Sequence, residues 1–394
     1  MIEVRRLAPL TLLAALLQAT AGGTILLLLP IDGLHAAGLI GGFALPGMMS
    51  LGAALMPLPA SRLVGRLGHK PVMGGGLALA TLGIAGVALG GSTPARGLAA
   101  FAYGVGLGLY GMSRIAYLSD AVPPERRGRI VSAVGGMGRV GMFIGPAAGG
   151  FVASHVGRGH ALLGAGALMA LAALAIVLVP ACPTLPSREA HTNVLRMVRR
   201  VVSEHRRTFA TAGVAMLALA LVRNGRMLLI PICGTMLGLN ESETGFVKSL
   251  SMGVDMLLFY PAGIAMDRLG RKWTAVPCLC GLSIGVFLIG HAESYASLVL
   301  AAVIAGAGNG LGAGINMTFA GDFSPREGRA DFLGVWSLMT EGGAAASPFI
   351  MGVVAGALSL APASLVVTTV GLLGALLVVR AVPEPLARAP AAAG

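Results

Sequence analysis

Twelve apolar runs alternate along the chain with short segments that carry charges, prolines or glycines. Each run is about 20 residues long, which an α-helix needs in order to cross the hydrocarbon core of a bilayer. The pattern predicts membrane helices at approximately 8–30, 37–58, 71–91, 96–118, 130–153, 160–180, 208–231, 244–266, 273–290, 295–317, 332–355 and 362–382. The first run is too long for the apolar core of a cleaved signal peptide, so we expect it to stay in the membrane.

Composition supports this interpretation and excludes several classes of protein. The mean hydropathy of the 394 residues is +0.84, and only 11% of them are charged, against about 25% in soluble domains. A soluble enzyme, a disordered chain and a nucleic-acid-binding domain are therefore excluded. The chain also has no metalloprotease, nucleophile-elbow or phosphate-loop motif, and we expect no enzymatic activity. The four cysteines, Cys182, Cys233, Cys278 and Cys280, form no metal-ligand or disulfide framework, and we interpret them as packing residues.

The basic residues predict the orientation of the helices. If the N-terminus is cytoplasmic, 21 of the 28 Lys and Arg residues fall in segments on the cytoplasmic side and only Arg96, Arg158 and Lys248 fall in outer loops. Cytoplasmic loops of membrane proteins carry such an excess of positive charge. We therefore expect a multi-pass protein of a bacterial cytoplasmic (inner) membrane with both termini in the cytoplasm. The net charge of +12 is then mainly an orientation signal and indicates no nucleic-acid partner.

A polar stretch at residues 182–207 divides the chain into two bundles of six helices, at 1–181 and 208–394. Residues 193–207 of this stretch contain five arginines. They could form a basic amphipathic helix on the inner leaflet, or simply a positively charged linker that fixes the topology.

The two halves repeat at an offset near 202 residues. The segment 65–70 after helix two corresponds to 267–272 after helix eight, and 124–129 after helix four corresponds to 325–329 after helix ten. Pro146 in helix five matches Pro348 in helix eleven. Because each half has an even number of helices, both halves enter the membrane in the same sense. We expect two bundles related by a pseudo-two-fold axis normal to the membrane, with a site between them.

At these residues the sequence resembles the major facilitator superfamily over essentially its whole length. The cytoplasmic family motif is complete in the second half, as Gly263, Asp267, Arg268, Gly270, Arg271 and Lys272. In the first half the corresponding glycine, aspartate and arginine are Ser61, Gly65 and His69. The resemblance implies the fold of that family, with twelve transmembrane helices and no strands.

The helix-five pattern of antiporter members is intact as Gly141, Gly145, Pro146, Gly149 and Gly150. This pattern implies a proton-driven exporter of the drug-antiporter type, although the family's helix-four arginine is replaced here by Ala99-Ala100-Phe101. Its physical role can be stated independently. A proline bends the helix, and glycines four residues apart let a neighbouring helix pack against the backbone.

Six ionisable residues lie within the predicted helices, where charge is costly and marks functional candidates. They are Arg114, Arg139, Arg223, Arg226, Asp255 and Glu341. Asp255 and Glu341 each lie twelve residues from a cytoplasmic charge, about 18 Å deep and therefore near the midplane. A carboxyl group at that depth is held ionised by an opposite charge and can carry a proton without one.

The helix arrangement implied by the resemblance suggests specific partners for these charges. We hypothesise that Arg139 pairs with Asp255 and that Glu341 is reached by Arg223 or Arg226. Alternatively, the Arg139–Asp255 pair is a static gate that never titrates. Arg223 and Arg226 share a helix face and could clamp an anionic group of a substrate, whereas Arg114 could bind substrate or extend its side chain to the cytoplasmic surface. Asp32 and His35 are interpreted as solvated residues at the outer end of helix one.

Further candidates for a substrate cavity are the polar residues Gln18, Asn309 and Asn316 and the apolar residues Met227, Phe259, Tyr260, Trp336 and Met339. The excess of buried arginine over acid suggests an anionic or zwitterionic small-molecule substrate. We expect a monomer without cofactors that exports small amphiphilic molecules, driven by the proton motive force. Alternatives are a metabolite symporter or facilitator, or a membrane sensor or scaffold that transports nothing.

Overall fold

The computed structural model describes residues 4–180 and 194–384, and every regular element in these ranges is a helix. The elements of the first half are α1 (Val4–Ala54), α2 (Pro57–Leu67), α3 (His69–Leu89), α4 (Thr93–Ala121), α5 (Pro124–Val156) and α6 (Arg158–Leu178). Those of the second half are α7 (Val194–Glu204), α8 (Arg206–Thr208), the π-helical turn η1 (Phe209–Gly213), α9 (Val214–Met236), α10 (Glu241–Leu269), α11 (Lys272–Gly290), α12 (Tyr295–Leu311), α13 (Ile315–Phe323), α14 (Arg329–Ala357) and α15 (Leu360–Ala381).

The predicted all-helical membrane fold is confirmed. Among the described residues, ten helical segments are long and apolar enough to cross a bilayer. The first of them, Ala8–Ala54, holds two of the predicted spans, because Ala37 and Gly38 have non-helical backbone angles between its two arms. With α4, which has 29 residues, the described chain has the predicted twelve spans. Helices satisfy their backbone hydrogen bonds internally, which the bilayer requires.

The predicted tenth helix is not continuous. It is divided into α12 and α13 at residues 312–314, where Gly314 has a φ of 85° that a residue with a side chain rarely adopts. In the first half the corresponding residues, Tyr110, Gly111 and Met112, remain helical within α4. Two glycines in place of one explain why only the second-half helix breaks.

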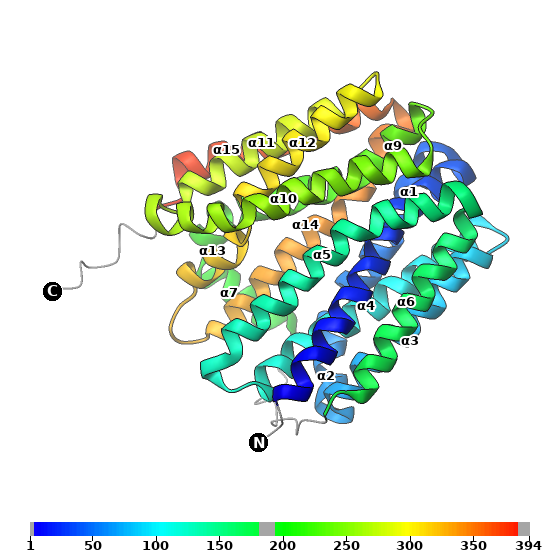
Figure 1. Cartoon of the computed structure of the whole chain (residues 1–394). Coiled ribbons are helices and arrows are strands. Elements are labelled where there is room, and N and C mark those ends of the chain that lie inside the picture. Colours follow the sequence, from blue (N-terminus) through cyan, green and yellow to red (C-terminus); the bar gives the residue numbers. More distant parts are fainter. Residues whose placement is uncertain (1–3, 181–193, 385–394) are drawn as a thin grey trace. The chain divides into compact units, whose positions relative to one another are not determined.

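The described chain forms two compact units. The first unit contains residues 4–180 together with 234–249, and the second contains 194–233 together with 250–384. In the first unit α1 packs against α4, α5 and α6, and α3 packs against α4 and α6 (Figure 1). In the second unit α11 packs against α12 and α15, and α14 packs against α15. Residues 182–193 of the predicted linker 182–207 lie outside the described residues.

Residues 234–249 differ from the predicted division, which places them in the second half. They are the end of α9 and the first turns of α10, and these turns of α10 contact α1 and α5. The reason is close backbone contact: a Cβ on Gly245 would lie 3.1 Å from the carbonyl carbon of Pro146, and one on Gly150 would lie 3.0 Å from that of Glu241. A side chain at either glycine would keep the two helices apart.

Candidate functional site

A buried ion pair joins α9 to α10 in the second unit. Nη2 of Arg226 lies 3.4 Å from Oδ2 of Asp255, and the two residues are 0% and 6% exposed. Nη1 of Arg226 donates hydrogen bonds to Oγ of Ser251 and to the carbonyl oxygen of Ala305, each at 3.3 Å. Charges removed from water need such partners, because an uncompensated buried charge costs several kcal/mol.

Asn309 of α12 extends the pair into a chain of four side chains. Its Nδ2 donates to Oδ2 of Asp255 at 2.5 Å, and its Oδ1 accepts from Nε of Arg223 at 2.6 Å. The amide therefore presents its donor to the carboxylate and its acceptor to the guanidinium, as their charges require. Arg223, Asn309, Asp255 and Arg226 form the polar cluster of the second unit, with two positive charges against one negative charge.

The polar cluster contacts the break between α12 and α13. Nη2 of Arg223 donates to the carbonyl oxygen of Gly312 at 2.8 Å, which lies just beyond the end of α12. The last carbonyls of a helix lack intrahelical partners and attract a cation. Interrupted membrane helices of this kind form substrate and ion sites in secondary transporters. The guanidinium of Arg223 therefore stabilises an interrupted helix beside a buried carboxylate.

Glu341 of α14 is not reached by either arginine in this structure. Arg223 and Arg226 are bound to α10 and α12, and Glu341 is exposed and forms no ion pair with any described residue. Its neighbours one helical turn away are Ser337, Leu338, Ala344 and Ala345. Of the large exposed side chains of α14, Leu338 is 42% exposed on this face, and Ile350 and Val353 lie on other parts of the helix surface. Three of the four neighbours of Glu341 on its own helix are therefore small, and the fourth is an exposed leucine.

The other predicted charged residues lie in the first unit. The guanidinium carbon of Arg114 lies 5.2 Å from the ring centroid of Tyr110 on the same helix, a cation–π contact. Arg139 is half-buried on α5. Because Arg139 and Asp255 belong to different units, their hypothesised pairing stays a prediction. Within the second unit, Asp255 contacts Arg226 and Asn309.

Several predicted cavity residues have other roles in the structure. Nε1 of Trp336 donates to Oδ1 of Asn316 at 2.8 Å, and Trp336 is 2% exposed among Phe209 and Phe332. Trp336 is thus a buried side chain that Asn316 orients, and its place at a substrate cavity stays a prediction. Gln18, Met227 and Met339 are half-buried, and Phe259 and Tyr260 are 42% and 75% exposed.

The helix-five pattern packs as the spacing of its glycines predicts. Added Cβ atoms on Gly141, Gly145 and Gly149 would lie 2.8–2.9 Å from the N of Thr20, the Cα of Gly23 and the Cβ of Thr24, all on α1. Oγ1 of Thr24 donates to the carbonyl oxygen of Gly145 at 2.9 Å. Pro146 lies in the same buried contact. Helices α1 and α5 are thus in direct backbone contact.

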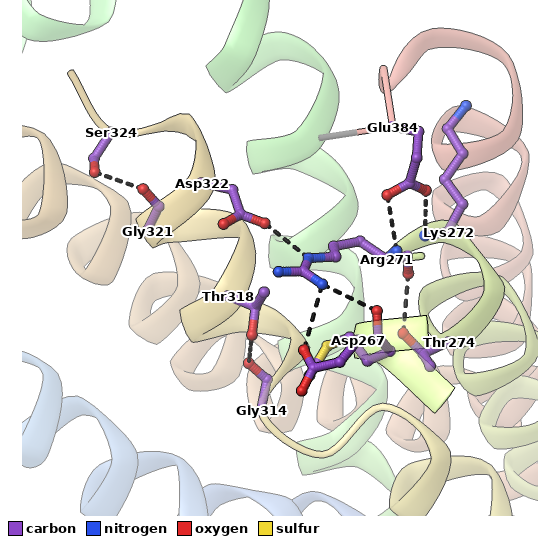
Figure 2. A network of polar contacts seen from close by, with 11 residues as sticks. Asp267, Arg271, Lys272, Thr274, Gly314, Thr318, Gly321, Asp322, Ser324 and Glu384 are labelled. Atoms are coloured by element: carbon purple, nitrogen blue, oxygen red, sulfur yellow. Dashed lines mark hydrogen bonds and ion pairs between the residues drawn. The ribbon is translucent and has the colours of Figure 1, made fainter. Parts of the chain in front are cut away.

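The cytoplasmic motif of the second half forms a charge network (Figure 2). The guanidinium of Arg271 lies between two carboxylates, with Nε 2.9 Å from Oδ2 of Asp322 and Nη1 3.5 Å from Oδ1 of Asp267. Glu384 accepts hydrogen bonds from the backbone N–H groups of Arg271 and Lys272 at 2.9 and 3.0 Å. This carboxylate satisfies free donors at the N-terminus of α11. Gly263 is half-buried and Arg268 exposed, and Gly270 has a φ of 108°.

The first half has an equivalent contact at the same repeat positions. Nε2 of His69 lies 2.9 Å from Oδ2 of Asp120, and residues 69 and 120 correspond to 271 and 322 at the offset of 202. The repeat found in the sequence is therefore also a repeat of side-chain contacts. Histidine replaces arginine, and in place of a second carboxylate the first half has Gly65.

Sequence reasoning missed three polar residues of the helices. Asn224 of α9 donates from Nδ2 to the carbonyl oxygen of Ala344, four residues before Pro348, which has no N–H to bond it. Lys248, predicted in an outer loop, is fully buried in α10, and Ser249 is 4% exposed beside it. The sequence signal was available, because Asn224 adjoins Arg223 and Lys248 falls inside the run 244–266.

Asp32 also departs from its interpretation as a solvated residue. It is 9% exposed, and its Oδ1 lies 3.3 Å from Nη1 of Arg158. The same guanidinium contacts Nδ1 of His35 at 2.8 Å and, through Nε, Oε1 of Glu241 at 3.7 Å. Four charged or titratable groups of α1, α6 and α10 thus meet at one end of the first unit.

The basic run of the predicted linker contains the helix α7 (Val194–Glu204), while its place on the inner leaflet stays a prediction. Helix α7 packs on α14, where Nη2 of Arg200 lies 2.9 Å from Oδ2 of Asp331 and Val201 is buried. Of the cysteines, Cys233 and Cys278 are buried and Cys280 is half-buried, each as a free thiol. Cys182 lies outside the described residues.

Comparisons with known proteins agree with this architecture. The family model described as Major Facilitator Superfamily matches residues 11–222 and 213–394. No curated protein sequence matches the chain. Among solved structures, a single-residue mutant of the nucleoside transporter NupG is similar with a TM-score of 0.77 at 16% identity, over 94% of this chain and 98% of NupG. A D-xylose-proton symporter has a TM-score of 0.75 at 15% identity, over 98% and 100% of the two chains. A POT family transporter in complex with 5-aminolevulinic acid has a TM-score of 0.75 at 13% identity, over 94% and 95%.

Proposed function

Because the chain belongs to the major facilitator superfamily, we propose that it is a proton-coupled secondary transporter that exports small amphiphilic molecules by alternating access. We place it in a bacterial cytoplasmic membrane with both termini in the cytoplasm. The observation that carries the proposal is the buried Arg226–Asp255 pair beside the interrupted helix. Export is supported by the intact helix-five pattern and its close packing on α1.

The polar cluster suggests how a proton and a substrate exchange. Protonation removes the negative charge of Asp255, and Arg226 then loses its only charged partner among the described contacts. A substrate amine placed at Asp255 instead requires the carboxylate form and displaces the proton. A zwitterionic substrate fits this arrangement best, with its amine at Asp255 and its anionic group at Arg223 or Arg226. Displacement of the proton by the amine is antiport.

The same geometry supports a second candidate function, proton symport. An anionic substrate without an amine competes with Asp255 for Arg226, and it binds best when Asp255 is protonated. Proton and substrate then bind together. A D-xylose-proton symporter has a similar fold, which supports keeping this alternative. The charge of the substrate decides between antiport and symport.

The sign of proton movement in lightly buffered, non-energised inside-out vesicles tests both candidates. We would add rhodamine B as a zwitterion, ethidium as a cation and fluorescein as an anion, and record dye uptake together with the external pH. Antiport acidifies the medium as dye enters, symport makes it alkaline, and a facilitator leaves the pH unchanged. Uptake of all three dyes equal to that of protein-free vesicles would contradict transport of this substrate class.

Two variants assign the coupling residue. We expect Asp255→Asn to abolish dye-dependent proton movement, and Glu341→Gln to do so if Glu341 is a second proton carrier. Glu293→Gln, on the exposed turn before α12, is the matched control. If Asp255→Asn keeps the proton movement of the native protein, Asp255 is a structural partner of Arg226 and not the coupling group.

A further inference from the structure

Lys248 of α10 binds a backbone carbonyl that a proline leaves free. Its ammonium donates to the carbonyl oxygen of Leu26 on α1. In an α-helix that oxygen accepts from the N–H four residues later, but residue 30 is Pro30, which has no N–H. The fully buried ammonium of Lys248 thus satisfies an acceptor that α1 cannot satisfy itself.

Ser249, the next residue of α10, forms hydrogen bonds with the backbone of a second helix, α5. Its Oγ accepts from the N–H of Ala147 at 2.9 Å and donates to the carbonyl oxygen of Phe143 at 2.7 Å. A regular α-helix joins these two groups directly, because they are four residues apart. The hydroxyl therefore bridges α5 beside Pro146, where the proline bends the helix and separates its turns.

Other contacts with α5 and α6 involve the same first turns of α10. The backbones of Gly245 and Pro146 approach closely, as do those of Gly150 and Glu241. The side chain of Glu241 lies 3.7 Å from Nε of Arg158 on α6. The first turns of α10 therefore fit a socket made by two proline-containing helices, α1 and α5.

We infer that Lys248 and Ser249 are latch residues that dock the first turns of α10 on α1 and α5 in one state of the transport cycle and release them in the other. The inference rests on the proposed function, since alternating access supplies the second state. It goes beyond that function because neither residue belongs to the polar cluster.

The two latch residues are not equivalent when α10 leaves. The N–H of Ala147 and the carbonyl of Phe143 can then bond to each other, so α5 compensates for the loss of Ser249. The carbonyl of Leu26 has no such alternative because of Pro30. Lys248 therefore stabilises the docked state more than Ser249 does.

Distances between spin labels test the latch without any substrate. We would label His155 near the end of α5 and Glu243 at the start of α10, both exposed, in a full-length chain whose four native cysteines are replaced by alanine, reconstituted in liposomes. The native sequence should give one dominant distance. Ser249→Ala should raise the fraction with a longer distance about five-fold, the equivalent of one ordinary hydrogen bond, and Lys248→Met should raise it further.

Control variants distinguish the loss of latch contacts from a general loss of stability. Ser242→Ala, on the same helix and outside all the contacts above, should keep the native distances. Ser249→Thr should restore the docked fraction, because it keeps the hydroxyl. Pro30→Ala gives the Leu26 carbonyl a donor of its own, so Lys248→Met should have a smaller effect in that background than in the native one.

Unchanged distances in both Ser249→Ala and Lys248→Met would overturn the proposal, as would equal effects of Ser242→Ala and Ser249→Ala. If Lys248→Met does not fold, Ser249→Ala decides the question, since it removes a single oxygen atom. A protein that moves no dye but shows these distance changes would disprove the proposed substrate class and leave the latch intact.

Discussion

Oδ2 of Asp255 is shared by Nη2 of Arg226 and Nδ2 of Asn309, at 3.4 and 2.5 Å. Within the described residues of the second unit, one carboxylate oxygen thus joins α9, α10 and α12. Any change of charge at this oxygen acts on three helices at once, which makes it suited to couple a proton to a movement.

The buried pair should respond differently to single and double substitution. Arg226→Met leaves Asp255 buried without its arginine and should lower the free energy of unfolding by about 3–5 kcal/mol. Arg226→Met combined with Asp255→Leu removes both charges and should recover most of that loss while transport stays absent. Thermal unfolding in detergent and dye uptake in vesicles measure the two effects. A double variant as unstable as Arg226→Met would show that the pair is not the main cause.

Glycine substitutions on α5 should distinguish its packed face from its open face. Gly145→Leu forces a side chain into the backbone of α1 and should cost about 1–3 kcal/mol or more. Gly136→Leu is the matched control, because a Cβ there meets no described atom within 4 Å. Yield and melting temperature of the two variants provide the measurement. Equal losses would mean that the helix-five pattern does not depend on contact with α1.

We expect the His69–Asp120 contact to contribute more to stability than the Arg271–Asp322 contact, although arginine carries the formal charge. Asp120→Ala leaves the 3%-exposed His69 without a partner on either ring nitrogen, since Nδ1 already has none among the described residues. That loss should cost about 1–3 kcal/mol. Asp322→Ala should cost less, because Arg271 keeps Asp267 and the carbonyl of Met266. Melting temperatures measured side by side test the order, and a larger loss for Asp322→Ala would contradict it.

The two tryptophans should report different surroundings. Trp273 is 70% exposed directly after Lys272, as expected for an aromatic side chain at the membrane interface, whereas Trp336 is 2% exposed. In single-tryptophan variants, Trp336→Phe and Trp273→Phe, brominated lipids should quench the fluorescence of Trp273 strongly and that of Trp336 weakly. Similar quenching of both would contradict the buried position of Trp336.

The sequence was sufficient for those features that depend on position along the chain. Apolar runs gave the spans, the offset of 202 gave equivalent positions such as His69 and Arg271, and the spacing of Gly141, Gly145 and Gly149 gave a face for backbone packing. Each of these follows from helix geometry alone.

The partners of the buried charges could not be obtained in the same way. Residue counting gives the depth of Asp255 and Glu341, but the rotation of each helix about its axis is set by packing with its neighbours. The contact of Arg226 with Asp255 and the burial of Trp336 therefore depend on how the neighbouring helices pack. The break after α12 was missed because Gly312 and Gly314 read as ordinary packing glycines within an apolar run.

The reversal at Ala37 and Gly38 has a consequence for how the protein is made. Only these two residues separate the arms of α1, and a Cβ on Gly33 would lie 3.1 Å from the Cα of Gly42 across the turn. A connection this short cannot be threaded across the bilayer apart from its flanking arms. We therefore expect the two arms to enter the membrane together as one helical hairpin, and a tag or protease site placed at this turn to disturb the close backbone contact between them.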